Sequence, residues 1–149
     1  MMKKTTLLLA NGIVGIVLIS LFSSSFADEQ FSNTEVISID GNIGIEKTTL
    51  TFSVPNDNNL PWAFVEGKIA NPVLDYPVVI QIYDNDDQIT GNDVGAVHFA
   101  QADVSEDGTY EYKFRVKDID GEKIVNIFEG DYTVIIFKVV YLYSNLSST

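Results

Sequence analysis

The sequence contains no cysteine and only one histidine, His98. Without cysteine the chain has no disulfide bond, no thiolate nucleophile, no cysteine-ligated zinc site, no iron–sulfur cluster and no c-type haem. A single histidine excludes a metal site built from two or three histidines of one chain. No G-x-S-x-G element is present to supply a nucleophile for a serine–histidine–acid triad. We therefore expect a protein that is not an enzyme.

Basic residues are also scarce. Nine Lys and Arg stand against 21 Asp and Glu, which gives a formal net charge of −12. A field of this sign repels the phosphate backbone of nucleic acids and anionic lipid surfaces, so nucleic acids are excluded as partners. A glycosidase uses a pair of carboxylates, and many such pairs can be chosen among these acids. No pattern in the sequence distinguishes one of them.

The chain has no apolar run that clearly reaches the roughly 20 residues needed to cross a bilayer. Its apolar stretch from Leu7 to Phe22 follows two lysines and precedes small residues that end at Ala27. This order is typical of a secretory signal peptide, and we expect its helix to be cleaved after Ala27. The alternative is an uncleaved membrane anchor. Both alternatives predict a secreted or extracellular cell-surface domain.

The rest of the chain shows strand periodicity and turn signals in place of helical spacing. The clearest strand is 109–117, in which aromatic and apolar residues alternate with charged ones. We expect about seven strands in an antiparallel sandwich. Their predicted ranges are 35–39, 46–54, 63–70, 77–83, 94–104, 109–117 and 132–143.

Three segments follow from this pattern. Residues 1–27 form the signal segment, 28–143 a single β-domain, and 144–149 a polar, flexible tail. Inside the domain, residues 117–129 fit no strand pattern. We expect them to form a long connection with a short helical turn.

The last predicted strand is apolar on both faces from Thr133 to Tyr143, apart from Lys138. Such a strand is stable only when both faces are covered. It could lie centrally within the domain, or it could pair with a neighbouring subunit by strand addition.

Two short motifs carry a resemblance to a known class of domain. Gly130-Asp131-Tyr132-Thr133-Val134 resembles the G-x-Y-x-V start of a late strand in immunoglobulin-like domains, and Asp107-Gly108-Thr109-Tyr110 resembles the D-G-x-Y hairpin of prokaryotic surface-protein sandwiches. Between Pro61 and Tyr143 the chain is similar to secreted immunoglobulin-like domains of archaeal cell-surface and surface-layer-associated proteins.

This resemblance implies an all-β, immunoglobulin-like antiparallel β-sandwich. It also implies a structural, non-catalytic role in adhesion, coat association or partner binding, with other cell-surface proteins or glycans as partners. Tyr132 would form a tyrosine corner, in which the hydroxyl bonds the backbone a few residues back. The alternatives are a self-assembling surface or filament subunit that uses strand addition at edge strands, and a Ca²⁺-stabilised binding domain.

An acidic loop supplies candidate calcium ligands. Asp84, Asp86, Asp87 and Asp93 lie within ten residues, and Ca²⁺ takes six to eight oxygen ligands. The loop is not an EF-hand, because Ile89 stands where the motif needs glycine. Asp and Asn also favour solvated hairpin loops, which is the other interpretation. The acids of 103–107 and 118–122 could contribute if their loops met at one end of the sandwich.

Two further features concern the surface. Tyr76, Tyr83, Tyr141 and Tyr143 could form an exposed aromatic patch for sugars or proteins. Asn145 begins an N-x-S acceptor pattern for glycosylation on the C-terminal tail.

Overall fold

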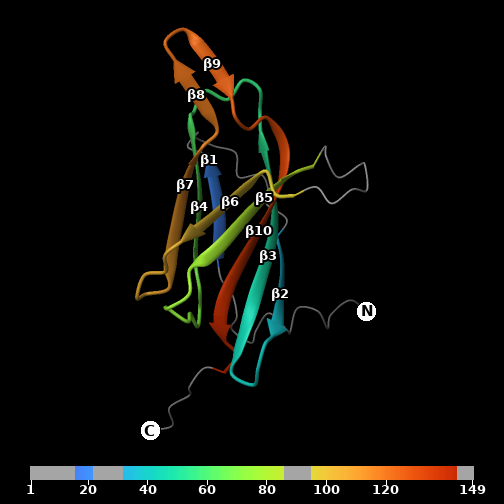
Figure 1. Ribbon diagram of the computed structural model, residues 1–149, viewed down its shortest axis with the longest axis vertical. Helices are drawn as coiled ribbons and strands as arrows, with labels where there is room; N and C mark the ends of the chain where they lie inside the picture. Colours follow the sequence, from blue (N-terminus) through green and yellow to red (C-terminus); the bar gives the residue numbers. More distant parts are fainter. Residues whose placement is uncertain (1–15, 22–31, 86–94, 144–149) are drawn as a thin grey trace, which may run out of the picture.

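The computed structural model describes residues 16–21, 32–85 and 95–143, with side chains for the last two ranges (Figure 1). All regular elements in these ranges are β-strands, and all strand pairs are antiparallel. The all-β prediction is therefore confirmed for the described part of the chain. In these ranges no helix is long and apolar enough to cross a membrane.

Two sheets form the body of the domain. The three-stranded sheet has the order β1-β4-β7, and the five-stranded sheet has the order β2-β3-β10-β5-β6. The strands of the first are β1 (Ile16–Leu21), β4 (Trp62–Lys68) and β7 (Thr109–Arg115). The strands of the second are β2 (Asn33–Ser38), β3 (Ile43–Val54), β10 (Gly130–Tyr141), β5 (Val78–Asp84) and β6 (His98–Ala102). Each of the seven predicted strands corresponds to one of these.

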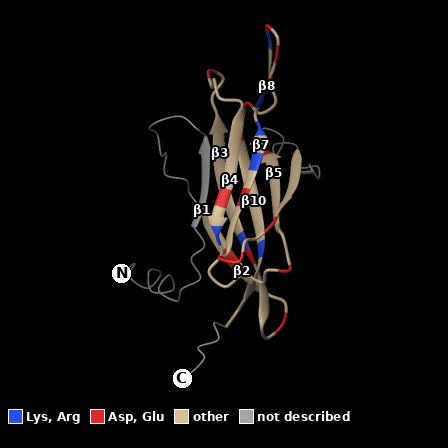
Figure 2. Cartoon of the chain, turned by 90° about the vertical axis from the view of Figure 1, so that its left-hand side faces the viewer, with Lys and Arg blue, Asp and Glu red and all other residues tan. Residues whose placement is uncertain are grey.

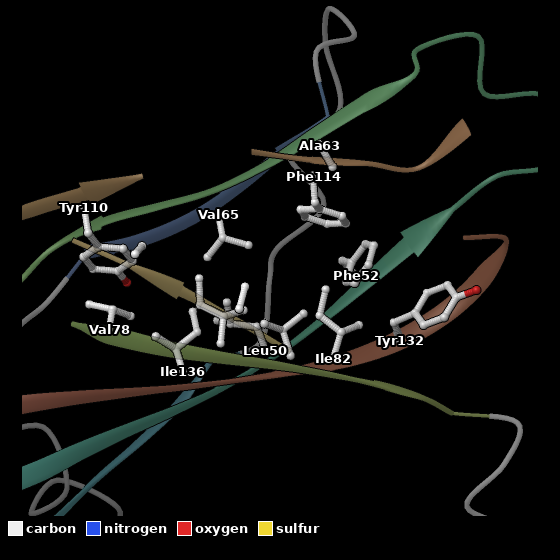
Figure 3. Close-up of a cluster of buried hydrophobic side chains, with 14 of the residues drawn as sticks. Leu50, Phe52, Ala63, Val65, Val78, Ile82, Tyr110, Phe114, Tyr132 and Ile136 are labelled. Atoms are coloured by element: carbon white, nitrogen blue, oxygen red, sulfur yellow. The ribbon is translucent and has the colours of Figure 1, made fainter. Parts of the chain in front are cut away.

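The core lies between the two sheets, which face each other in a sandwich-like arrangement (Figure 3). Every second residue of β3 from Gly44 to Val54 is buried, as expected for a strand with one face in the core. Phe52 of β3 meets Phe114 of β7 edge-on at 6.1 Å between ring centroids. On β7 the aromatic face points inward and the charged face outward, as the sequence pattern predicts.

The long apolar strand β10 is central in the five-stranded sheet. It pairs with β3 along its whole length and with β5 from Tyr132 to Phe137. Both backbone edges of this stretch are therefore satisfied inside the domain. Strand addition by a second copy cannot use these residues, and only the edge strands of the two sheets are left for it.

The segment expected to be a long connection is a β-hairpin, so that prediction is wrong. Strands β8 (Lys117–Asp120) and β9 (Lys123–Asn126) pair with each other and project from one end of the molecule (Figure 1). The two-residue turn is Gly121-Glu122, and the φ of 61° at Gly121 is typical of a tight hairpin.

The expected N-terminal helix is wrong for the six residues that are described there. Ile16–Leu21 forms β1, which pairs with β4 from Lys68 to Ala63. The segment is rich in β-branched residues, which favour strands, and β4 offers it an edge. Export and cleavage after Ala27 remain predictions, and the remainder of 1–27 lies outside the described residues.

Candidate binding surface

Part of the outward side of the five-stranded sheet is apolar. Along β10, Val134, Ile136 and Val140 point into the core, so Ile135 and Val139 point outward. Cross-strand partners point to the same side of a sheet, which places the outward residues of neighbouring strands next to them. We call this surface the apolar face. It consists of Ile37, Ile45, Val79, Tyr83, Phe99, Ile135, Phe137, Val139 and Tyr141.

These side chains include one continuous row and one cross-strand pair. Val139 lies opposite Ile45, which in turn lies opposite Ile37 on β2. Phe137 lies opposite Val79 on β5. The residues of the central strands are half-buried by one another, whereas those at the margins are open to solvent.

Charged side chains beside the apolar face are paired. Among its described neighbours, Lys47 and Glu35 neutralise each other in an ion pair of 3.0 Å between Nζ and Oε1. Asp131 lies at one end of the sheet and accepts a hydrogen bond from the hydroxyl of Ser53. On this outward side the acids Glu35 and Asp131 are therefore both paired with a neighbouring side chain.

The outward side of the three-stranded sheet differs. Lys113 Nζ lies 4.3 Å from the ring centroid of Trp62, and the guanidinium of Arg115 lies 4.8 Å from it. Arg115 also bonds Asp118 at 2.6 Å. Figure 2 shows acidic and basic positions along β4 and β7 and at the turns. This side therefore has the mixed polarity of an ordinary solvated face.

The β8–β9 hairpin adds a second exposed apolar feature. Ile119 and Ile124 are cross-strand partners, and both are more than half exposed. A lone two-stranded hairpin is marginally stable in water. It therefore gains stability from the contacts at its base, where Ile127 and Phe128 donate their N–H groups to the carbonyl oxygen of Val116.

The structural motifs singled out in the sequence are formed. The hydroxyl of Tyr132 bonds the backbone of Glu129, which is the contact predicted for a tyrosine corner, and Gly130 has φ of 96°. At the other turn, Asp107 Oδ1 accepts hydrogen bonds from the hydroxyl and the N–H of Thr109. These bonds, chiefly that from the hydroxyl, lower the pKa of Asp107. Gly108 has φ of 84°.

The candidate calcium site falls mostly outside the described residues. Asp84 ends β5, whereas Asp86, Asp87 and Asp93 are not described. In the part of the chain that is described, no three side chains of His, Cys, Asp or Glu come together to hold a metal. The acids of 103–107 and those of the β8–β9 hairpin lie near opposite ends of the molecule, so they do not converge (Figure 1). A calcium site at the 84–93 loop remains a prediction.

His98 makes a local contact of the kind expected for a lone strand histidine. Its Nε2 lies 2.9 Å from the hydroxyl of Tyr112, and its ring stacks on Phe114 at 6.0 Å between centroids. Partial burial lowers the pKa of His98, because desolvation disfavours the charged form.

The surface predictions have mixed outcomes. Tyr76, Tyr141 and Tyr143 are exposed, whereas Tyr83 is half-buried and donates its hydroxyl to Gln81 Oε1 at 2.8 Å. Asn145 lies outside the described residues. The sequence did not single out the apolar face as a unit, because it reveals apolar outward positions strand by strand but not how the strands are ordered.

The apolar face is thus the main candidate site. Comparison of the chain with protein-family models, with curated proteins and with solved structures finds no match. The function must therefore be argued from this surface and from the chemistry of the chain.

Proposed function

We propose that the chain is an exported, non-catalytic module with an immunoglobulin-like fold that binds a partner at the cell surface. The partner is a cell-surface protein or a glycan chain. The N-terminal signal pattern supports export, and the lack of cysteine and of a second histidine supports a role without catalysis.

The apolar face is the observation that carries this proposal. Antiparallel sheets commonly present polar residues on the side that faces solvent. Here that side presents nine aliphatic and aromatic residues among polar ones, with Phe99 58% exposed at its margin. Extended apolar patches on soluble domains mark interaction sites, and the centres of interfaces are poor in charge and rich in aromatic residues.

A photo-crosslinking experiment tests the proposal. A benzophenone-bearing phenylalanine is introduced at Phe99, on the apolar face, and the protein is irradiated on the cells that produce it. Glu111, an exposed residue of β7 on the other sheet, is the matched control position. We expect a defined adduct with a second macromolecule from position 99 and none from position 111.

The same design can contradict the proposal. Absence of any adduct from position 99, or equal labelling from both positions, would show that the apolar face does not contact a partner. Because Phe99 is largely exposed, its replacement should leave the fold intact, which circular dichroism can check.

A second candidate function is self-assembly by strand addition, and the place of β1 favours it. Ile16–Leu21 covers one edge of β4 and belongs to the segment that we expect to be cleaved after Ala27. Cleavage would leave this edge of β4 unpaired. An unpaired edge accepts an extended strand from another chain, which here would be a second copy.

Sedimentation measurements separate the two functions. A chain that begins at Asp28 should form concentration-dependent oligomers, whereas a chain that begins at Ile16 retains β1 and should not. If the chain from Asp28 is monomeric at all concentrations, self-assembly through β4 is ruled out and the binding module stands alone.

A further inference from the structure

A lysine and a glutamate lie side by side in the core between the two sheets. Lys138 of β10 and Glu46 of β3 are direct cross-strand partners, and both belong to the inward-pointing series of their strands. Their exposed fractions are 0% and 1%. The ammonium nitrogen of Lys138 and Oε1 of Glu46 are in contact.

The surroundings of the pair provide little polar compensation. Among the described residues, neither the Lys138 nitrogen nor either Glu46 oxygen makes a hydrogen bond of ordinary geometry. The inward-pointing residues next to the pair on β10 and β3 include Ile136, Val140 and Thr48, of which only Thr48 is polar. A buried ion pair without further hydrogen bonds recovers only part of the cost of removing both charges from water.

A third buried polar group points into the same space. Tyr110 of β7 projects from the opposite sheet into the core (Figure 3), and its hydroxyl has no hydrogen-bond partner in the described part of the chain. Burial raises the pKa of Tyr110, and the charge of Glu46 raises it further.

We propose that Lys138 and Glu46 condense to form an intramolecular amide bond that covalently links β10 to β3. The reaction removes both charges from the core and replaces them with one neutral amide. Contact between the two groups, held by the sheet register, supplies the proximity that makes such a step effectively unimolecular.

The step balances without any co-reactant. A proton passes from the ammonium to the carboxylate, which gives a neutral amine and a neutral acid. The amine nitrogen attacks the carboxyl carbon, a carbon–nitrogen bond forms, and the carbon–oxygen bond breaks as one water leaves.

The link would join two strands that lie far apart in the sequence. β3 is the first long strand of the five-stranded sheet and β10 is the last, and they are adjacent in the centre of it. A chain without cysteine has no disulfide to serve this purpose. The amide does not depend on the redox state of the surroundings.

Mass spectrometry of the purified full chain tests the proposal. The intact mass should fall below that required by the sequence by one water molecule. Trypsin should then fail to cleave after Lys138 and should yield a branched peptide, in which the peptide that ends at Lys47 is joined to the peptide that begins at Ile124. Tandem fragmentation should place the junction at Glu46 and Lys138.

The Lys138→Arg variant is the matched control, because arginine keeps the positive charge and does not form this amide. Any N-terminal cleavage removes the same residues from wild type and variant. The difference between their two intact masses therefore reveals the missing water without knowledge of the cleavage site. The proposal is overturned if wild-type protein has the full mass and releases a linear peptide 124–138. The peptide measurement needs only wild-type protein, so it tests the proposal even if the variant does not fold.

Discussion

Tyr132 and Glu129 are joined by two hydrogen bonds at the start of β10. The Tyr132 hydroxyl accepts from the Glu129 N–H at 2.8 Å and donates to the Glu129 carbonyl oxygen at 3.0 Å. The ring of Tyr132 stacks on Phe52 at 5.2 Å between centroids, so the same side chain anchors the turn and fills the core. The turn before the central strand is therefore held by one hydroxyl.

Tyr132→Phe should remove both hydrogen bonds and retain the ring packing. We expect the free energy of unfolding to fall by about 1–3 kcal/mol, because two backbone groups lose their partner. Urea denaturation measures the loss. Tyr83→Phe is the control, since the hydroxyl of Tyr83 bonds only the side chain of Gln81 near the surface. Equal losses in the two variants would contradict the anchoring role.

Gly108 combines a positive φ with a close backbone contact. A Cβ at this position would lie 2.5 Å from the carbonyl oxygen of Ile69. The N–H of Ile69 in turn donates a hydrogen bond of 2.9 Å to the carbonyl oxygen of Gly108. At Gly121, which also has positive φ, a Cβ would meet nothing within 4 Å.

These two glycines make a matched pair of variants. Gly121→Ala should cost about 1–2 kcal/mol, the strain of a left-handed backbone. Gly108→Ala should cost clearly more, because it adds a clash with backbone that cannot move without breaking the turn. Denaturant titration of both variants provides the comparison, and a loss at Gly108 no greater than that at Gly121 would refute the steric argument.

His98 should make stability fall in mildly acidic solution. Its pKa in the folded state is lowered by burial from the ordinary value of 6.5, so the unfolded chain binds the proton more readily. The neutral His98 contributes its full stabilisation at pH values above its pKa in the unfolded chain. This stabilisation is lost as the pH falls through its pKa in the folded state.

Proton NMR can follow this titration directly, because His98 is the only histidine. We expect a midpoint below 6.5, and unfolding midpoints that decline as the pH is lowered past that value. His98→Gln should remove this part of the pH dependence and leave the carboxylate titration at lower pH. A midpoint at or above 6.5 would show that burial does not control the group.

Local sequence pattern is sufficient for seven of the ten described strands and for one turn. The alternation of Tyr110, Tyr112 and Phe114 with charged residues identified β7 and its inner face. The Asp107-Gly108 signal predicts a turn, and Gly108 has positive φ there. These features depend on neighbours within a few residues, which is the range over which periodicity and turn chemistry act.

The remaining features depend on contacts between distant segments. The Asp-Gly signal at Asp120 and Gly121 does not by itself predict a hairpin, because its flanking strands are only four residues long. β1 was assigned as a helix because its apolar run fits a signal peptide as well as a strand. The apolar face and the partnership of Lys138 with Glu46 follow from strand order and register, which no local pattern specifies.

The Lys138–Glu46 pair provides a test of what a buried charge costs in this core. Lys138→Met leaves the Glu46 carboxylate buried without a counter-ion. Glu46→Leu leaves the Lys138 ammonium buried without one. Each single change should cost about 3–5 kcal/mol, because an uncompensated charge stays in the core. The double variant removes both charges and keeps apolar volume, so it should be more stable than either single variant.

Chemical denaturation of the four proteins measures this cycle, and the wild type then reports on the amide. If the amide forms, wild-type protein should remain more stable than the double variant, because a covalent link between β3 and β10 restricts the unfolded chain. If only an ion pair is present, the double variant should match or exceed the wild type, since apolar replacement of buried ion pairs is often neutral or stabilising. Single variants as stable as the double would contradict the burial of the pair itself.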